Sequence, residues 1–578
     1  MPRFQTLLIL CAFAFPLSAV EIQRLSPGHS PRPGDLVEWE LAQPPAEWMQ
    51  ADPRHAPFLR ITESDGTVFE RPAFLFQAHR VDPSHRQGEY KALGEVSLRI
   101  RHSPRQAGSL RWDLFAPRAD PETATPLASD TLSIAPGRRA AGAIAQAPYN
   151  HRLLAYPDGR PFIPIGPNVA WALGRDRLAT FITYLDALAE VGGNHVRVWC
   201  ASWFGQIEGS QPQQWRLDQA WLLDQVFTAA AQRGIAITLV LDNHHDFQVG
   251  DNFPYGSSIS ERGNNFFSDN LAPGYRARIH YLIARYAAFD NLKAWELFNE
   301  IDLTGLERWR LVNWARSASD FLAGADPYMR LRTISWAGDD WPQMRELPRI
   351  NLYHIHRYVP HTDHLGPGDD DIIAVMAGDV TPLMDARRPF LFAEVGHHGN
   401  TAEDVPGNAL DQEGLILVHM AWAGFLLGGA GPGMNWWWDS WIHEGGLWHL
   451  YKPMRQAIDR IDWRDSGLRP MSVPLDADLR VIGWQSPHQA LVWPQTVQDN
   501  WFKALIRQSD NPFAGRRFGL TLNGMETGRR YSVTALDMFD GSLRMSSEAE
   551  SDENGRLRLA LPAHDGRQVL VITAISHP

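Results

Sequence analysis

The sequence predicts an α/β protein in which a TIM-type (β/α)8 barrel lies between two antiparallel β-sandwich domains. The middle of the chain alternates apolar, strand-like runs with amphipathic helical stretches, which is typical of βα units around a parallel sheet. Both ends of the chain instead show short alternating runs separated by turn signals. The length of 578 residues also exceeds what one hydrophobic core usually organises, so several domains are expected.

The first residues have the pattern of a secretory signal. An apolar run covers residues 7–15, and Leu17-Ser18-Ala19 supplies the small residues of a cleavage site. We therefore expect residues 1–19 to be a signal peptide and the mature chain to be exported to the periplasm or the extracellular space. Lipid attachment at Cys11 is the weaker alternative, because the preceding Leu10 is bulky.

The composition argues against several classes of partner. Lys and Arg total 54 against 66 Asp and Glu, with no basic stripe, so no nucleic-acid partner is expected. Beyond the signal no run of about twenty uncharged apolar residues occurs, so no membrane span is predicted. Cys200 is then the single cysteine of the mature chain, which leaves no intrachain disulfide. The oligomeric state is not predicted.

Residues 20–136 predict the leading domain. Residues 36–41, 96–100 and 110–115 alternate apolar and polar side chains, as strands with one buried face do. We expect an immunoglobulin-like antiparallel β-sandwich here. Residues 137–148 are small and flexible at their start and lack periodicity, so they are predicted to be a linker.

Residues 149–469 predict the barrel. The candidate strands are residues 162–169, 195–200, 235–242, 292–298, 331–336, 350–356, 389–393 and 428–436. The main helical stretches between them are residues 177–190, 218–233, 276–288, 307–323 and 412–427. Eight is the strand number of this barrel, and no glycine-rich phosphate turn follows the first strand to favour an open doubly wound sheet.

Residues 470–578 predict the closing domain. The alternating pattern returns at residues 479–484, 490–493 and 569–572. A second antiparallel β-sandwich is therefore expected after the barrel.

Two predicted strands end directly on carboxylates. The fourth runs into Asn299-Glu300 and the seventh into Glu394. In such a barrel the reactive side chains lie at the C-terminal ends of the strands, so these two groups are expected to face one cavity.

These strand ends resemble those of clan A retaining glycoside hydrolases. Trp295-Glu296-Leu297-Phe298-Asn299-Glu300 and Phe392-Ala393-Glu394 are similar to the clan's fourth- and seventh-strand motifs. Shorter similarities lie at the ends of strands two, three, six and eight: Val196-Arg197-Val198-Trp199, Leu241-Asp242-Asn243-His244-His245, His356-Arg357-Tyr358 and Trp436-Trp437-Trp438-Asp439. Within the clan the chain most resembles family 5 cellulase-like and mannanase-like bacterial proteins that carry a β-sandwich before the barrel.

The resemblance implies a retaining β-glycoside hydrolase that cleaves O-glycosidic bonds of a β-linked poly- or oligosaccharide by double displacement. Glu394 would be the nucleophile and Glu300 the acid/base, with their carboxyl groups about 5–5.5 Å apart. Asn299 would hold the sugar's 2-hydroxyl, Arg197 would keep Glu394 ionised, and Tyr358 would orient Glu394.

Other site residues follow less directly from the resemblance. His356 belongs to the strand-six motif, and one member of the pair His244-His245, taken as His245, is expected to line the sugar site. Trp437 or Trp438 would form a stacking floor for the first sugar. Glu296 is expected deeper in the barrel, in a polar network.

No cofactor and no metal are expected. The pairs His244-His245 and His397-His398 match no structural zinc spacing, and the clan's hydrolysis needs no metal. Residues 248–265, rich in Gly, Asn and Ser, read as a loop that either builds a subsite wall or is plain surface.

Three other functions remain open from the sequence. A barrel that only binds glycan would have lost catalysis, a transglycosylase would use the same carboxylates with a sugar acceptor, and a metallohydrolase would be sensitive to chelators. The sugar, the linkage and the choice between end and mid-chain cleavage are not predicted.

Overall fold

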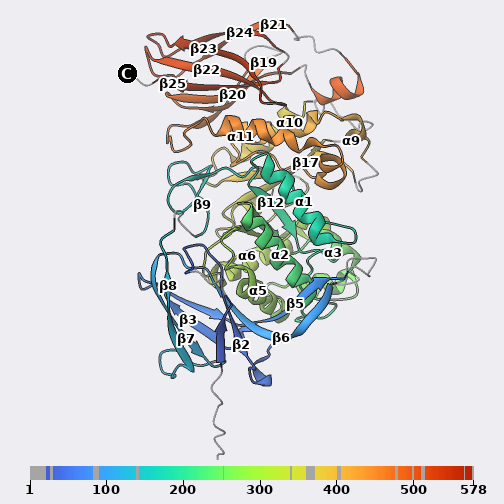
Figure 1. Ribbon diagram of the computed structural model, residues 1–578. Coiled ribbons are helices and arrows are strands. Elements are labelled where there is room, and N and C mark those ends of the chain that lie inside the picture. Colours follow the sequence, from blue (N-terminus) through green and yellow to red (C-terminus); the bar gives the residue numbers. More distant parts are fainter. Residues whose placement is uncertain are drawn as a thin grey trace, which may run out of the picture.

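A computed structural model shows an elongated molecule with three successive regions along the chain (Figure 1). It describes residues 21–25, 30–82, 90–137, 142–250, 253–338, 341–359, 371–399, 405–474, 479–497, 500–509, 515–564 and 566–575. The predicted signal peptide, residues 1–19, and residues 138–141 of the predicted linker lie outside the described residues.

The N-terminal region consists of two four-stranded antiparallel sheets. One has the order β1 (Glu21–Arg24), β2 (Val37–Ala42), β6 (Tyr90–His102), β5 (Phe74–Val81). The other has the order β4 (Val68–Pro72), β3 (Phe58–Thr62), β7 (Gly108–Phe115), β8 (Ala128–Ile134). Trp39 of β2 meets Trp112 of β7 with ring centroids 6.3 Å apart, so the two sheets share apolar contacts between their faces.

The central region is built on parallel strands. β12 (His195–Trp199), β13 (Ala236–Val240), β14 (Leu292–Glu296) and β15 (Leu331–Thr333) pair in that order, and β16 (Tyr353–Val359) pairs with β17 (Phe390–His397). All residues of β12, β13, β14 and β17 are buried. Such burial on both faces explains why these strands are nearly continuous apolar runs.

Backbone hydrogen bonds continue this ring through segments that form no regular strand. Leu352 N donates to Arg332 O across 3.3 Å, between β15 and β16. Val395 N donates to Met434 O across 2.9 Å, and Asn168 N donates to Asn435 O across 2.9 Å. Residues 430–436 therefore lie between β17 and residues 163–169, in the order of a (β/α)8 barrel.

The segments expected to form the first and eighth strands therefore occupy those places in the barrel. They are joined to their neighbours by isolated hydrogen bonds, without a regular strand ladder. Only β11 (Pro161–Phe162) carries strand structure at the first position, in a small sheet with β10 (Leu154–Ala155) and β9 (Ala145–Gln146). Proline lacks the N–H that a ladder needs, and Pro164, Pro167 and Pro432 interrupt these segments.

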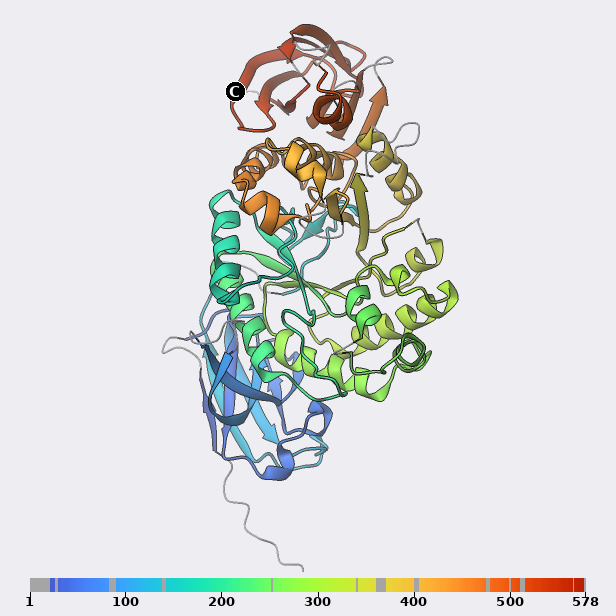
Figure 2. The ribbon, with the colours of Figure 1, turned by 90° about the vertical axis from the view of Figure 1, so that its right-hand side faces the viewer.

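Helices cover the outside of the parallel strands (Figure 2). The long ones are α1 (Arg177–Glu190), α2 (Leu217–Gln232), α5 (Pro273–Tyr286), α6 (Arg308–Ala325) and α10 (Leu415–Leu426), each within three residues of its predicted bounds. Shorter ones are α7 (Pro342–Arg345), α8 (Ile372–Val380), α9 (Pro406–Leu410) and α11 (Lys452–Ile458).

Residues 248–265 are not the simple loop that their composition suggests. They contain the end of α3 (His244–Val249) and most of α4 (Ile259–Phe266). Ser258 and Glu261 form a capping box at the start of α4, a helix signal that is visible in the sequence as Ser-x-x-Glu.

The C-terminal region is again antiparallel. A six-stranded sheet has the order β18 (Arg469–Pro474), β19 (Leu479–Gln485), β20 (Gln489–Thr496), β25 (Gln568–Ala574), β22 (Arg530–Asp537), β23 (Leu543–Glu550). β21 (Arg516–Leu522) pairs with β24 (Leu557–His564). Trp484 Nε1 donates to the Phe425 carbonyl of α10 across 2.8 Å and so ties the sheet to the central region.

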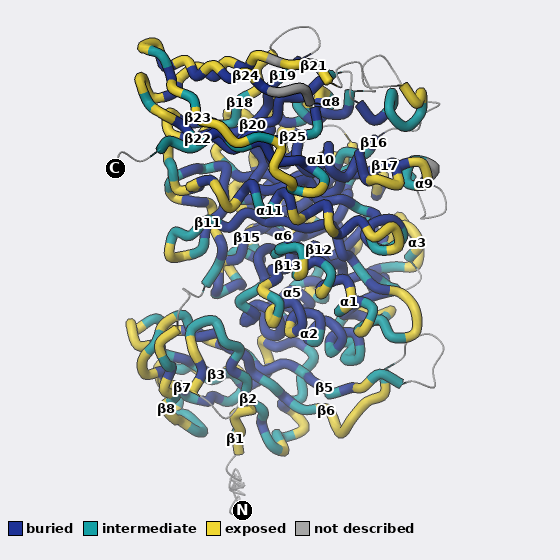
Figure 3. The backbone as a smooth tube through the Cα atoms, turned by 45° about the horizontal axis from the view of Figure 1, so that its top comes forward, coloured by how far each residue is buried: buried dark blue, intermediate teal, exposed yellow. Residues whose placement is uncertain are grey.

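Buried charges join the N-terminal sheets to the central helices. Asp224 of α2 receives Arg101 Nη1 of β6 at 2.7 Å and Arg285 Nη2 of α5 at 2.7 Å. All three side chains are buried, so removing one partner would leave a charge without compensation. Buried backbone predominates through the central region (Figure 3). None of the helices in the described ranges has the length and apolarity of a membrane span.

Candidate active site

A buried arginine organises the C-terminal ends of the barrel strands. Arg197 of β12 donates Nη1 to Glu394 Oε1 at 2.5 Å, and Nε and Nη2 to the two oxygens of Glu296 at 2.7 Å each. Its Nη2 also donates to Asn299 Oδ1 at 2.5 Å. The planar guanidinium therefore fixes three side chains from β14, β17 and the segment after β14.

Glu394 lies inside β17 and is 3% exposed. Besides Arg197, it accepts a hydrogen bond from the Tyr358 hydroxyl at 2.6 Å. Burial raises the pKa of Glu394 above its ordinary value, while His356, Arg197 and the Tyr358 hydroxyl oppose that rise. These donors favour the ionised form of Glu394, and the pKa of Tyr358, raised by burial and by Glu394, keeps its hydroxyl protonated.

Glu300 follows β14 in a left-handed backbone conformation, with φ 50° and ψ 57°. Such a conformation is costly for a residue other than glycine and is found at functional sites. Its N–H donates to Ser335 Oγ at 3.1 Å, and its Oε1 lies 2.8 Å from His356 Nδ1. Local bonds thus hold Glu300 in the conformation that turns its side chain toward His356.

Glu300 differs from Glu394 in its electrostatic surroundings. Burial raises the pKa of Glu300 to about 7, with His244 acting against the rise and Asp302 adding to it. Arg197 donates directly to Glu394, whereas the Glu300 carboxyl group contacts the ring nitrogen Nδ1 of His356. Burial thus favours the protonated form of Glu300, whereas the bonds from Arg197 and Tyr358 favour the ionised form of Glu394.

The two carboxylates and His356 form one tight group. An oxygen of Glu300, an oxygen of Glu394 and a ring nitrogen of His356 all lie within 4.8 Å of one another. An approach this close is compatible with retaining glycosidases, whose carboxyl groups stand about 5–5.5 Å apart, and is too close for the roughly 6.5–9.5 Å of inverting ones.

The same three residues offer one ligand atom each to a cation. However, Arg197 Nη1 already lies 2.5 Å from Glu394 Oε1, and a positive charge at that distance disfavours a second cation on the same carboxylate. The donor set fits proton transfer and nucleophilic attack better than metal binding.

Asn299 presents its amide N–H groups to the site. Its Oδ1 accepts from Arg197 Nη2 and, at 3.3 Å, from Ser335 Oγ, so the amide orientation is fixed by two donors. Its Nδ2 lies 3.3 Å from His244 Nδ1. An amide held in this way can donate to a hydroxyl of a bound sugar.

The two histidines of the predicted pair have different environments, and His244 is the one beside the carboxylates. His244 Nδ1 lies 3.5 Å from Glu300 Oε2, whereas His245 is exposed and packs against Trp203 with ring centroids 5.1 Å apart. α3 begins at His244 after the cap Asn243. Neighbouring helix positions point about 100° apart, so only one of two consecutive histidines can face the carboxylates.

The two candidate stacking tryptophans have different environments. Trp438 is 1% exposed and lies among Trp171 and Trp436, with ring centroids 5.0 and 5.2 Å away. Trp437 is 6% exposed and donates Nε1 to the His397 carbonyl at 2.8 Å. Trp436 is more exposed than either, so the structure offers Trp436 as an aromatic surface that the sequence prediction did not select.

Glu296 lies below the site as expected. It is fully buried, receives both Arg197 bonds, and lies 2.9 Å from His354 Nδ1. Burial raises its pKa, but Arg197 and His354 outweigh burial and hold the pKa well below its usual range. Ser335 and His244 are the site residues that the prediction missed; Ser335 belongs to the predicted fifth strand end, where a search for polar residues would have found it.

Comparison with known proteins adds sequence and fold relatives, although no protein-family model matches the chain. Probable mannan endo-1,4-beta-mannosidase F of Neosartorya fischeri is 27% identical over 156 residues, which are 24% of this chain and 34% of that protein. Mannan endo-1,4-beta-mannosidase F of Aspergillus fumigatus is 32% identical over 108 residues, 18% and 24% of the two chains. The chain thus matches about a third or less of the length of these curated relatives.

Solved structures give a wider match. A putative glycoside hydrolase from Bacteroides vulgatus superposes with a TM-score of 0.59 at 16% identity, covering 94% of this chain and 100% of that one. A glycoside hydrolase family 5 structure from the same species has a TM-score of 0.51 at 15% identity, covering 75% and 92%. At such identities the likeness concerns the fold. These sequence and fold relatives confirm the resemblance that the strand-end motifs first indicated. The chain resembles mannanase-like proteins of family 5 in clan A.

Proposed function

We propose that the protein is a retaining β-glycoside hydrolase with Glu394 as nucleophile and Glu300 as acid/base. The observation that carries this proposal is the approach of the two carboxylates within 4.8 Å, combined with their unequal hydrogen bonding. A pair with this separation and two distinct protonation states is what double displacement requires.

The reaction proceeds in two steps. Glu394 attacks the anomeric carbon while Glu300 gives its proton to the departing glycosidic oxygen, so a glycosyl ester replaces the glycosidic bond. Esterification removes the negative charge of Glu394, which lowers the pKa of Glu300. Glu300 then takes a proton from water as that water attacks the anomeric carbon, and Glu394 leaves as a carboxylate.

The surrounding residues support these steps. Arg197 and Tyr358 hold and orient the ionised Glu394, and Asn299 Nδ2 donates to the sugar's 2-hydroxyl, where a bond strengthens toward the transition state. His356 Nδ1, which faces both carboxylates at 2.8 and 3.4 Å, positions them relative to each other. Trp437, with Trp436 beside it, is the aromatic surface for the first sugar.

The proposal extends to domains and location. Residues 20–136 and 470–578 are β-sandwich domains that brace a catalytic barrel of residues 149–469, with residues 137–148 as linker. The paired antiparallel sheets and the Trp39–Trp112 contact support the first sandwich. Residues 1–19 direct export, so the protein acts in the periplasm or outside the cell.

A β-1,4-linked mannan is the first substrate to test, because the curated relatives are mannan endo-1,4-beta-mannosidases. The purified full chain is incubated with β-linked mannans, glucans and galactans and with aryl β-glycosides, each with and without EDTA. We expect at least one substrate to be cut and EDTA to leave the rate unchanged. Failure to cut any of them, or loss of activity with EDTA, would overturn the proposal.

The pH dependence of kcat/KM follows from the two carboxyls. Glu300 must be protonated, so the rate falls as pH rises above about 7, the pKa to which burial raises this group. Glu394 must be ionised, so the rate also falls at low pH. Asp302→Asn removes a negative charge that raises the pKa of Glu300, and the basic limb of the profile should move to lower pH. A basic limb that stays in place in the variant would contradict this account.

A further inference from the structure

Three buried side chains form a chain of hydrogen bonds that leads to Glu394. His354 Nδ1 of β16 lies 2.9 Å from Glu296 Oε2 of β14, and Glu296 accepts Nε and Nη2 of Arg197 at 2.7 Å each. Arg197 Nη1 then donates to Glu394 Oε1 at 2.5 Å. His354 is therefore connected to Glu394 through two intermediate side chains.

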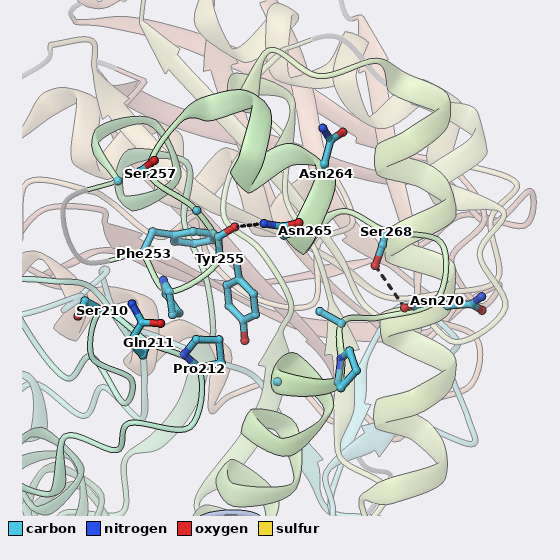
Figure 4. A pocket seen from close by; sticks show the side chains of 16 residues that line it. Ser210, Gln211, Pro212, Phe253, Tyr255, Ser257, Asn264, Asn265, Ser268 and Asn270 are labelled. Carbon is cyan, nitrogen blue, oxygen red and sulfur yellow. Dashed lines mark hydrogen bonds between the residues drawn. The ribbon is translucent and has the colours of Figure 1, made fainter.

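None of these three side chains is in a position to touch a substrate. Arg197, Glu296 and His354 are each 0% exposed. The pocket of about 820 Å³ that Figure 4 shows lies on the segments after β12 and β13, and none of the three lines it. Any effect of His354 on a reaction at Glu394 must therefore pass through Glu296 and Arg197.

The hydrogen of the His354 ring lies on Nδ1. Burial would raise the pKa of Glu296, but Arg197 and His354 outweigh burial and hold that pKa well below its usual range, so Glu296 is an ionised acceptor. Burial lowers the pKa of His354 to about 4, although Glu296 opposes this change, so the ring is neutral. A neutral imidazole carries one N–H, and an ionised carboxylate can only accept, which places that hydrogen on the nitrogen facing Glu296.

The N–H of His354 affects how one guanidinium is shared between two carboxylates. Glu296 and Glu394 are both buried and both bonded to Arg197. Because His354 supplies Glu296 with a further donor, Glu296 depends less on Arg197 for its hydrogen bonds. Arg197 Nη1 is then kept directed at Glu394, where a nearby cation favours the ionised form.

The titratable and charged groups around Glu296 and Glu394 come from three strands and one strand end. They are Arg197 and His195 of β12, Lys293 of β14, Glu300 after β14, and His354, His356 and Tyr358 of β16. Burial lowers the pKa of Lys293 to about 7 and raises that of Glu300 to about 7. Both groups therefore titrate on the basic side of a pH profile, and its acid side reports the ionisation of Glu394.

We propose that His354 is a positioning residue for the nucleophile: through Glu296 it keeps Arg197 directed at Glu394, and so keeps Glu394 ionised for attack. The proposal rests on the proposed function for the role of Glu394. His354 itself neither contacts the sugar nor exchanges a proton during turnover.

The first measurement uses the wild-type protein and no substrate. ¹⁵N NMR of protein labelled at its histidines distinguishes a ring hydrogen on Nδ1 from one on Nε2, and the His354 signals are assigned by their absence in His354→Asn. At about pH 6, we expect a neutral ring with its hydrogen on Nδ1. A protonated ring, or a hydrogen on Nε2, would overturn the proposal whether or not any variant folds.

The second measurement is the pKa of Glu394. ¹³C NMR of protein labelled at the glutamate carboxyls follows it, with the signal assigned by its absence in Glu394→Gln. His354→Leu removes the donor, and His354→Asn restores it, because the amide nitrogen of asparagine is bonded to Cγ as Nδ1 is in histidine. His419→Leu is the matched control, since His419 of α10 is another buried histidine, 2% exposed, and packs against Trp493 with ring centroids 5.3 Å apart.

We expect His354→Leu to raise the pKa of Glu394 and to move the acid limb of kcat/KM to higher pH, each by about 0.5–1. His354→Asn should return both to their wild-type positions, and His419→Leu should change neither. The basic limb should stay in place throughout. A folded His354→Leu protein with an unchanged pKa of Glu394, or a His354→Asn protein that behaves like His354→Leu, would contradict the positioning role.

This proposal and the proposed function can fail separately. If the pKa of Glu394 rises in His354→Leu but no substrate is hydrolysed by the wild-type protein, the proposed reaction is wrong and the coupling of His354 to Glu394 stands. If a substrate is hydrolysed and neither the pKa nor the acid limb changes, the reaction stands and the role of His354 is wrong.

Discussion

Glu394→Gln is expected to lower kcat by on the order of 10⁴-fold or more on any substrate that the protein cuts. The amide keeps the shape of the side chain: its oxygen can still accept from Arg197 and its N–H can donate to the Tyr358 oxygen, but it cannot form the glycosyl ester. Arg197 also keeps its two bonds to Glu296, so no buried cation is left unpaired and the fold should be retained.

Steady-state rates and a thermal melt of both proteins provide the measurement. Glu307→Gln is the matched control, since Glu307 is an exposed glutamate at the start of α6 and should retain full activity. A folded Glu394→Gln protein that keeps more than a few per cent of the rate would remove Glu394 from the nucleophile role.

Glu300→Ala is expected to lose about 10²–10⁴-fold in rate on a polysaccharide, because the leaving oxygen no longer receives a proton. An activated aryl β-glycoside, whose leaving group needs no protonation, should still form the glycosyl-enzyme, which then accumulates because no base activates water. Azide needs no base, so it should attack the anomeric carbon, release Glu394 and restore turnover.

The product of that rescue is a β-glycosyl azide, which mass spectrometry and NMR identify. Asn313→Ala serves as the control and should show wild-type rates that azide leaves unchanged, since Asn313 is an exposed residue of α6. A folded Glu300→Ala protein that azide fails to accelerate would argue against the acid/base role.

The helices and the buried central strands could be predicted from the sequence. Apolar residues recur at helical spacing where one helix face is buried, and they form continuous runs where both faces of a strand are buried. α1 was predicted over the residues that it occupies, and β12 and β13 follow apolar runs. The places of the first and eighth strands could be predicted, but their irregular backbone could not. Pro164, Pro167 and Pro432 lack backbone N–H donors, so isolated hydrogen bonds replace a ladder there.

In the site, the strand-end motifs led to the carboxylates, Arg197, Asn299 and Tyr358, which the structure brings together. The choice between His244 and His245 depended on where α3 begins, and helix boundaries are poorly defined by sequence. Burial of Trp438 likewise depends on its contacts with Trp171, which lies far away along the chain. Such features arise from tertiary packing and have no local signal.

The anomer formed first during hydrolysis tests the central claim most directly. ¹H NMR of the fresh reaction of wild-type protein with a β-linked substrate follows the anomeric proton before mutarotation mixes the two forms. Double displacement by Glu394 and Glu300 inverts the anomeric carbon twice, so the account predicts the β-anomer first. The α-anomer appearing first would mean a single displacement by water, and the assignment of Glu394 as nucleophile would be wrong.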